Sequence, residues 1–77
     1  MSASIWGNLG AKGVDRAKVE PGIKKILGPP TTIAKPQFRE AFLKEVSVAI
    51  GRPVTHGETI EYFLIADEIW DTWPTIS

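Results

Sequence analysis

Apolar residues recur at helical intervals in the second half of the chain. From residue 38 onwards they follow one another at spacings of three or four, which places them on one stripe of an α-helix. The stripe consists of Phe38, Phe42, Val46, Ala49 and Ile50. Pro36 suits the first turn of such a helix and Gly51 suits its end. The pattern therefore predicts a helix over about 36–50.

A second helix is predicted over about 58–71. Thr55 and Glu58 have the spacing of a capping box, in which a hydroxyl and a carboxylate pair with free backbone amides at a helix start. Most apolar residues of this segment lie opposite its acidic residues, but Ile60 and Leu64 fall on the acidic side. The apolar arc is wider than one neighbouring helix covers. Part of it must therefore meet the N-terminal half or another molecule.

A β-hairpin is the alternative structure for residues 52–63. Its two strands would flank a turn at His56 and Gly57, because Thr, Ile, Tyr and Phe favour strands. The two interpretations differ in fold class, since the hairpin would make the domain α+β and the helix would make it mainly α.

Glycine and proline interrupt the first half of the chain. Residues 1–13 contain three glycines and no sustained hydrophobic period, which predicts a flexible arm. Farther along, a Pro-Gly pair and a Gly-Pro-Pro run leave room for only a short helical turn near 22–27. The expected fold is mainly α, with one small globular domain over 14–77.

Charge is divided unequally along the chain although the net charge is zero. Residues 1–39 carry seven basic and two acidic side chains, a net charge of +5, and residues 40–77 carry two basic and seven acidic ones, a net charge of −5. Such asymmetry is typical of a basic arm for nucleic acid, of an acidic face for a basic protein, or of two halves that neutralise each other within one fold.

Residue types that carry chemistry are sparse. The chain has one histidine, His56, and no cysteine, and no nucleophile, base and acid can be assembled around that histidine. We therefore expect no catalysis, no cofactor, no metal and no small-molecule substrate. The missing cysteine fits a reducing compartment, and the longest apolar run, 62–66, is far too short to cross a bilayer. The expected location is the cytoplasm, without membrane association.

Aromatic and acidic residues near the C-terminus are candidates for binding another protein. Tryptophans rimmed by carboxylates make good interface anchors, although core packing is the commoner use of aromatic clusters. The predicted anchors are Trp6, Trp70 and Trp73, and the predicted steering charges are Asp67, Glu68 and Asp71. The expected function is that of a protein-binding regulator or inhibitor of a larger host assembly, like the accessory proteins of phages and mobile elements. A second copy of the chain is an alternative partner.

The order of elements also suggests a nucleic-acid-binding function. An extended segment, Thr31 to Ala34, precedes the two predicted helices, and this order over roughly 31–72 is loosely similar to ribbon-helix-helix regulators. The resemblance implies a dimer whose paired strands enter the major groove of DNA. The residues that would contact phosphate are Lys24, Lys25, Lys35 and Arg39. The segment departs from that family because it lacks alternating basic residues.

Overall fold

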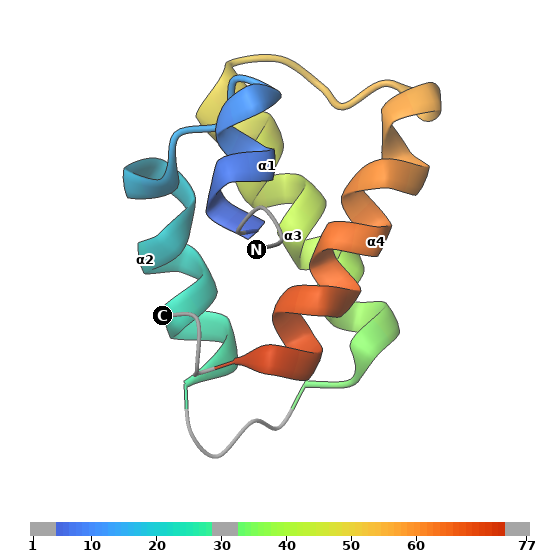
Figure 1. The fold of residues 1–77 in the computed structure, drawn as a ribbon. Helices are drawn as coiled ribbons and strands as arrows, with labels where there is room; N and C mark the ends of the chain where they lie inside the picture. Colours follow the sequence, from blue (N-terminus) through green and yellow to red (C-terminus); the bar gives the residue numbers. More distant parts are fainter. Residues whose placement is uncertain (1–4, 29–32, 74–77) are drawn as a thin grey trace.

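The structure, a computed structural model, describes residues 5–28 and 33–73 and consists there of four α-helices (Figure 1). They are α1 (Ile5–Ala11), α2 (Arg16–Leu27), α3 (Lys35–Ile50) and α4 (His56–Thr72). No strand occurs within the described ranges, so the mainly α prediction is confirmed and the hairpin over 52–63 does not form.

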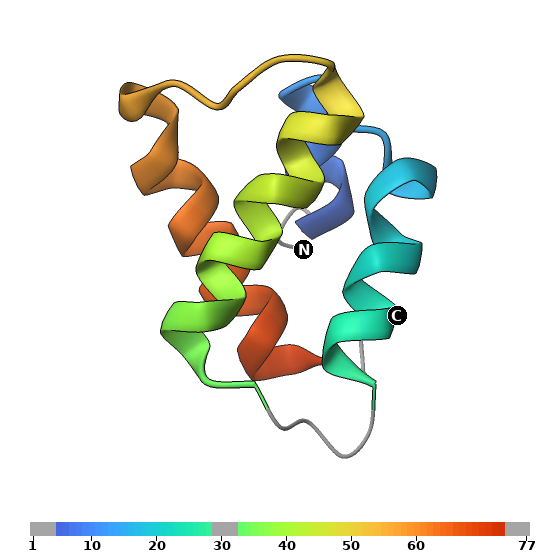
Figure 2. The same ribbon diagram turned by 180° about the vertical axis from the view of Figure 1, so that it is seen from behind.

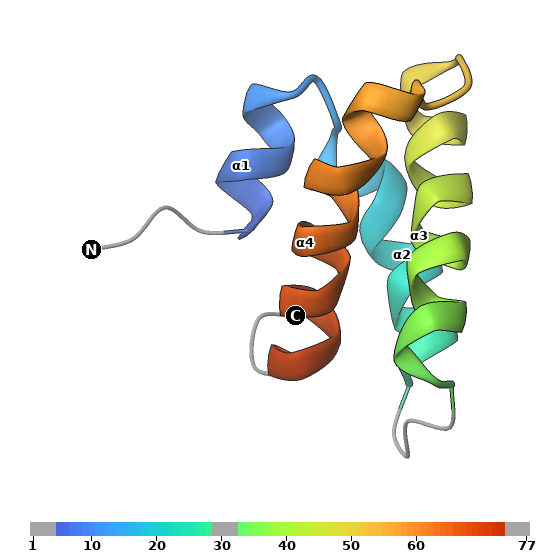
Figure 3. The same ribbon diagram turned by 90° about the vertical axis from the view of Figure 1, so that its right-hand side faces the viewer.

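The helices alternate in direction along the chain, up, down, up and down (Figure 1). Each helix packs against the next one in the sequence. In addition, α1 packs against α4, which closes the bundle. From behind, α3 lies between α2 and α4 (Figure 2), and from the side α1 lies next to α4 and away from α3 (Figure 3). Thirteen hydrophobic side chains, drawn from all four helices and from Val14, form the buried core.

The two helices of the second half match the prediction closely. Phe38, Phe42 and Val46, one turn apart along α3, are all fully buried, as the stripe requires. Gly51 ends this helix with a left-handed backbone, φ 74°, which glycine adopts without strain. Thr55 and Glu58 form the predicted capping box at the start of α4.

Helix α2 is longer than the turn predicted near 22–27. It begins at Arg16, where the Asp15 carboxylate caps it by accepting a hydrogen bond of 3.0 Å from the backbone N–H of Ala17, and it continues through Pro21. An interior proline costs about 3 kcal/mol. Val19, Ile23 and Leu27 are fully buried four residues apart. At about 1.5–3 kcal/mol for each buried side chain, this stripe offsets the proline.

Helix α1 is the element that the glycine-rich pattern did not predict. Of the flexible arm expected over 1–13, residues 1–4 lie outside the described residues, and Ile5–Ala11 is helical, with Ile5 and Leu9 turned into the core. The helix ends in a Schellman motif at Gly13, φ 84°. In that motif Gly13 N–H donates to Gly10 O at 3.0 Å and Val14 N–H donates to Leu9 O at 2.9 Å.

Two glycine substitutions test the assignment of α1 as a helix. A β-carbon at Gly10 or at Gly13 would meet no atom within 4 Å, so the two sites differ only in backbone conformation. Gly10→Ala should raise the free energy of unfolding by about 0.5–1 kcal/mol, because alanine favours the helix. Gly13→Ala should lower it by roughly 1–2 kcal/mol, because φ is positive there. Urea denaturation followed by circular dichroism measures both, and equal effects would contradict this description of α1.

Phe42 tests the core in the same way. Its ring lies 6.0 Å from that of Phe38 and 6.4 Å from that of Tyr62, between α3 and α4. Phe42→Ala should lower the free energy of unfolding by about 3–5 kcal/mol, because it leaves a cavity. Phe42→Leu fills most of that space and is the matched control. If Phe42→Ala lowers the free energy of unfolding no more than Phe42→Leu does, the central position of this ring is contradicted.

Candidate functional site

Ion pairs attach α4 to the basic first half of the chain. They join Lys12 to Glu61, Lys35 to Asp71 at 3.0 Å, and Arg39 to Asp67. The +5 and −5 halves therefore neutralise each other along both sides of α4, one side facing α1 and the other facing α3.

The pair between Arg39 and Asp67 has the best geometry of the three. The Arg39 Nε atom donates to Asp67 Oδ1 at 2.7 Å, and the Nη2 atom donates to Oδ2 at 2.6 Å. These two parallel bonds lower the pKa of Asp67. The Asp67 carboxylate thus links α4 to α3, and its role in steering a partner stays a prediction.

The three predicted tryptophan anchors are half-buried and pack against the core. Trp70 Nε1 donates to Ile33 O at 3.2 Å, and Lys35 Nζ lies 5.0 Å from the centre of the Trp70 ring. Trp6, on α1, is covered by Arg16, whose guanidinium lies 4.6 Å from the indole ring. Trp70, Asp67 and Asp71 all lie near the end of α4. There they contact residues at or just before the start of α3. The partner-binding role of the predicted anchors, including Trp73, stays a prediction.

The outer side of α4 carries apolar residues that no neighbouring helix covers. Ile60 and Leu64, one turn apart, are 68% and 65% exposed. Beside Leu64 a groove of about 470 Å³ opens between α1 and α4. Its lining consists of Asn8, Ala11, Lys12, Glu61, Leu64, Ile65 and Glu68. Of the predicted steering residues, Glu68 alone lines this groove. We call the groove and Ile60 together the α1–α4 face.

The sequence did contain the signal for this face. Ile60 and Leu64 fall on the acidic side of the predicted helix. In a simple amphipathic helix that side carries polar and charged residues. The candidate list favoured tryptophans instead, because they are frequent interface anchors.

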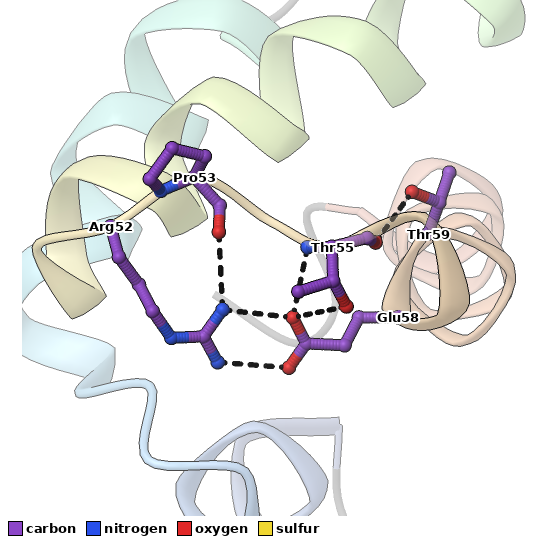
Figure 4. Close-up of polar contacts among 5 residues, drawn as sticks. All are labelled: Arg52, Pro53, Thr55, Glu58 and Thr59. Carbon is purple, nitrogen blue, oxygen red and sulfur yellow. Dashed lines mark hydrogen bonds and ion pairs between the residues drawn. The ribbon is translucent and has the colours of Figure 1, made fainter.

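A polar network lies where α3 passes into α4 (Figure 4). The two terminal nitrogens of Arg52 donate to the two carboxylate oxygens of Glu58 at 2.9 and 3.0 Å, and Nη1 also donates to Pro53 O at 3.1 Å. The backbone N–H and hydroxyl of Thr55 donate to Glu58 Oε1 at 3.0 and 2.9 Å. These donors lower the pKa of Glu58 to about 2, with Arg52 making the largest contribution. Thr59 adds a bond from its hydroxyl to Thr55 O.

The predicted phosphate-binding residues do not form one stripe. Lys24 and Lys25 are exposed in the last turn of α2. Lys35 and Arg39 lie at the start of α3, where they pair with carboxylates of α4. The extended segment of the ribbon-helix-helix comparison is described only at its end, where Ala34 is extended with φ −75° and ψ 152°. Residues 31 and 32 lie outside the described residues.

Two further features are absent from the part of the chain that the structure describes. No group of three or more His, Cys, Asp or Glu residues there could hold a metal ion. No helix there is long and apolar enough to cross a membrane. The buried residues of the described ranges are all hydrophobic, and no buried side-chain nitrogen or oxygen atom there lacks a hydrogen-bond partner. The α1–α4 face combines exposed apolar side chains with charged residues at a groove.

The network at Glu58 predicts how stability depends on pH. Its pKa is about 2 in the folded state and about 4.3 in an unfolded chain. A carboxyl group with a lowered pKa stabilises the fold above its unfolded pKa, and this stabilisation is lost as pH falls through the folded pKa. Between about pH 4.5 and pH 2 the melting temperature of Glu58→Gln should therefore fall less steeply than that of the wild type.

The measurement is thermal unfolding between pH 2 and pH 7. Glu40→Gln is the matched control, because Glu40 is exposed on α3 and forms no ion pair with any described residue. It should keep the wild-type slope over the acid range. Parallel curves for the wild type and Glu58→Gln would show that the Arg52 and Thr55 contacts do not stabilise the carboxylate.

Comparison with known protein families, with curated proteins and with solved structures finds no match to this chain. No relative therefore supplies a function or a set of site residues by analogy. The functional argument rests on the exposure, charge and shape of the α1–α4 face.

Proposed function

We propose that this chain is a small protein-binding regulator that acts by docking on a larger protein assembly through the α1–α4 face. The observation that carries the proposal is the exposure of Ile60 and Leu64, two large aliphatic side chains one turn apart, of which Leu64 lines a groove. Each buried square ångström of apolar surface contributes about 25 cal/mol, so covering this pair would favour association.

A single exposed apolar side chain needs no functional explanation. Val48 on α3 is such a residue, 81% exposed and distant in sequence from the groove. Ile60 and Leu64 differ from it because they form a pair and because Leu64 lines a groove with charged ends. An apolar centre with a polar rim is the arrangement of protein–protein interfaces.

The proposed action is binding without chemistry, in the manner of an inhibitor or accessory subunit of a host assembly. Glu58, the carboxylate with the strongly lowered pKa, is engaged in capping α4, which gives that shift a structural cause. We place the protein in the cytoplasm, because a chain without cysteine fits a reducing compartment.

Affinity capture with three matched baits tests the proposal. The baits are the wild type, Leu64→Asp and Val48→Asp, exposed to lysate of the organism that encodes the chain. A partner of the α1–α4 face should be retained by the wild type and by Val48→Asp at equal levels and be depleted at least about tenfold by Leu64→Asp, which puts a charge into the interface core. Proteins retained equally by all three baits, or none retained by the wild type, would contradict the proposal. Circular dichroism establishes beforehand that all baits are folded.

A further inference from the structure

The groove-lining residues of α4 follow a regular order of charge. Glu61, Leu64, Ile65 and Glu68 lie at relative positions 0, 3, 4 and 7, so two carboxylates bracket two aliphatic residues over two helical turns. At 1.5 Å per residue this pattern is about 10 Å long. The opposite side of the groove is formed by α1 with small side chains, Asn8 and Ala11, which let another backbone approach closely.

We propose that the groove binds an amphipathic helix of a partner protein that carries two basic residues seven positions apart, with large apolar residues between them. The inference rests on the proposed function and adds the chemistry of the partner. A helix fits because the groove runs between two antiparallel helices, and a third helix can insert an apolar stripe there, as in helix-in-groove recognition. Its apolar residues contact Leu64 and Ile65, and its cations contact the two carboxylates.

Charge selects a basic occupant. Helix α4 carries five acidic residues and no lysine or arginine. Glu61 is 62% exposed and uses Oε2 for Lys12, which leaves Oε1 without a hydrogen bond to any described residue. Glu68 forms no ion pair with any described residue. Both carboxylates can therefore accept from a partner lysine or arginine, and a partner acid would be repelled.

A second copy of the chain satisfies this pattern poorly. Two α4 helices packed on each other would bring carboxylates together. Helix α2 does offer Lys18 and Lys25 at the required spacing on its exposed side. Between them, however, stand Pro21 and Gly22, which provide no long apolar side chain to fill the groove beside Leu64.

Binding of designed peptides to the full chain tests the proposal. The probe is a fluorescein-labelled helical peptide with Lys at positions i and i+7 and Leu at i+3 and i+4. A staple on the side that faces away from the groove holds it in the helical form. One control peptide replaces the two lysines by glutamate, and another replaces the two leucines by serine. Anisotropy titrations at low salt should give the lysine peptide an affinity at least about tenfold higher than either control. Added salt should reduce the ratio between the affinities of the lysine peptide and the glutamate peptide.

A charge exchange at Glu68 makes the test specific. Glu68→Lys should weaken the lysine peptide about tenfold and improve binding of the glutamate peptide. Leu64→Ser should remove binding of the lysine peptide, whereas Val48→Ser should leave it unchanged. Circular dichroism melting curves identify any variant that is not folded, and Glu68→Gln, which removes the charge without reversing it, then replaces Glu68→Lys.

Three results would overturn the inference. The first is the absence of binding to the lysine peptide, and the second is equal affinity for the lysine and glutamate peptides. The third is self-association of the wild type in sedimentation velocity that depends on Leu64, because a second copy would then occupy the groove.

The capture experiment separates failure of this inference from failure of the proposed function. Leu64-dependent capture without peptide preference rejects only the inferred partner chemistry. Peptide preference without captured protein rejects the proposed regulatory function.

Discussion

The burial of α4 is the constraint on which the rest of the structure depends. This helix is apolar over more of its circumference than one neighbour can cover, so α3 packs on one side of it and α1 on another. Phe42 and Tyr62 join α3 to α4, and Ile65 and Ile69 extend the core along the helix. α1 is short, seven residues, and no described residue covers Ile60 and Leu64 on the outer side of α4. The α1–α4 face is thus a consequence of how α4 is packed.

The ion pairs follow from the same arrangement. Because α4 is acidic and lies between α3 and the segment that follows α1, its flanking carboxylates meet Lys12, Lys35 and Arg39. Exposed ion pairs of this kind stabilise a fold weakly. Their larger effect here is on which charges remain available. Asp67 and Asp71 pair with cations of α3, whereas Glu68 lines the groove and forms no ion pair with any described residue.

Prediction from sequence succeeded where local pattern and tertiary packing agree. The stripe from Phe38 to Ile50 and the capping box at Thr55 have local signals that packing reinforces, and both are found. It failed where packing overrides local preference. Pro21 is a helix breaker by itself, yet the buried stripe of α2 carries the helix through it. In α1 only two residues, Ile5 and Leu9, face the core, and the glycines around them make this short pattern hard to recognise.

The site could be predicted only in part, for a related reason. A helical wheel identifies Ile60 and Leu64 as apolar residues on the acidic side, but only the placement of α1 determines whether another helix covers them. Leu64 is exposed while its neighbour Ile65 is buried, so Ile65 can hold α4 in place without any contribution from Leu64. Leu64 can therefore take the proposed binding role while Ile65 packs in the core. This separation allows Leu64 to be replaced without loss of the core, which is why changes at Leu64 report on binding and changes at Phe42 report on folding.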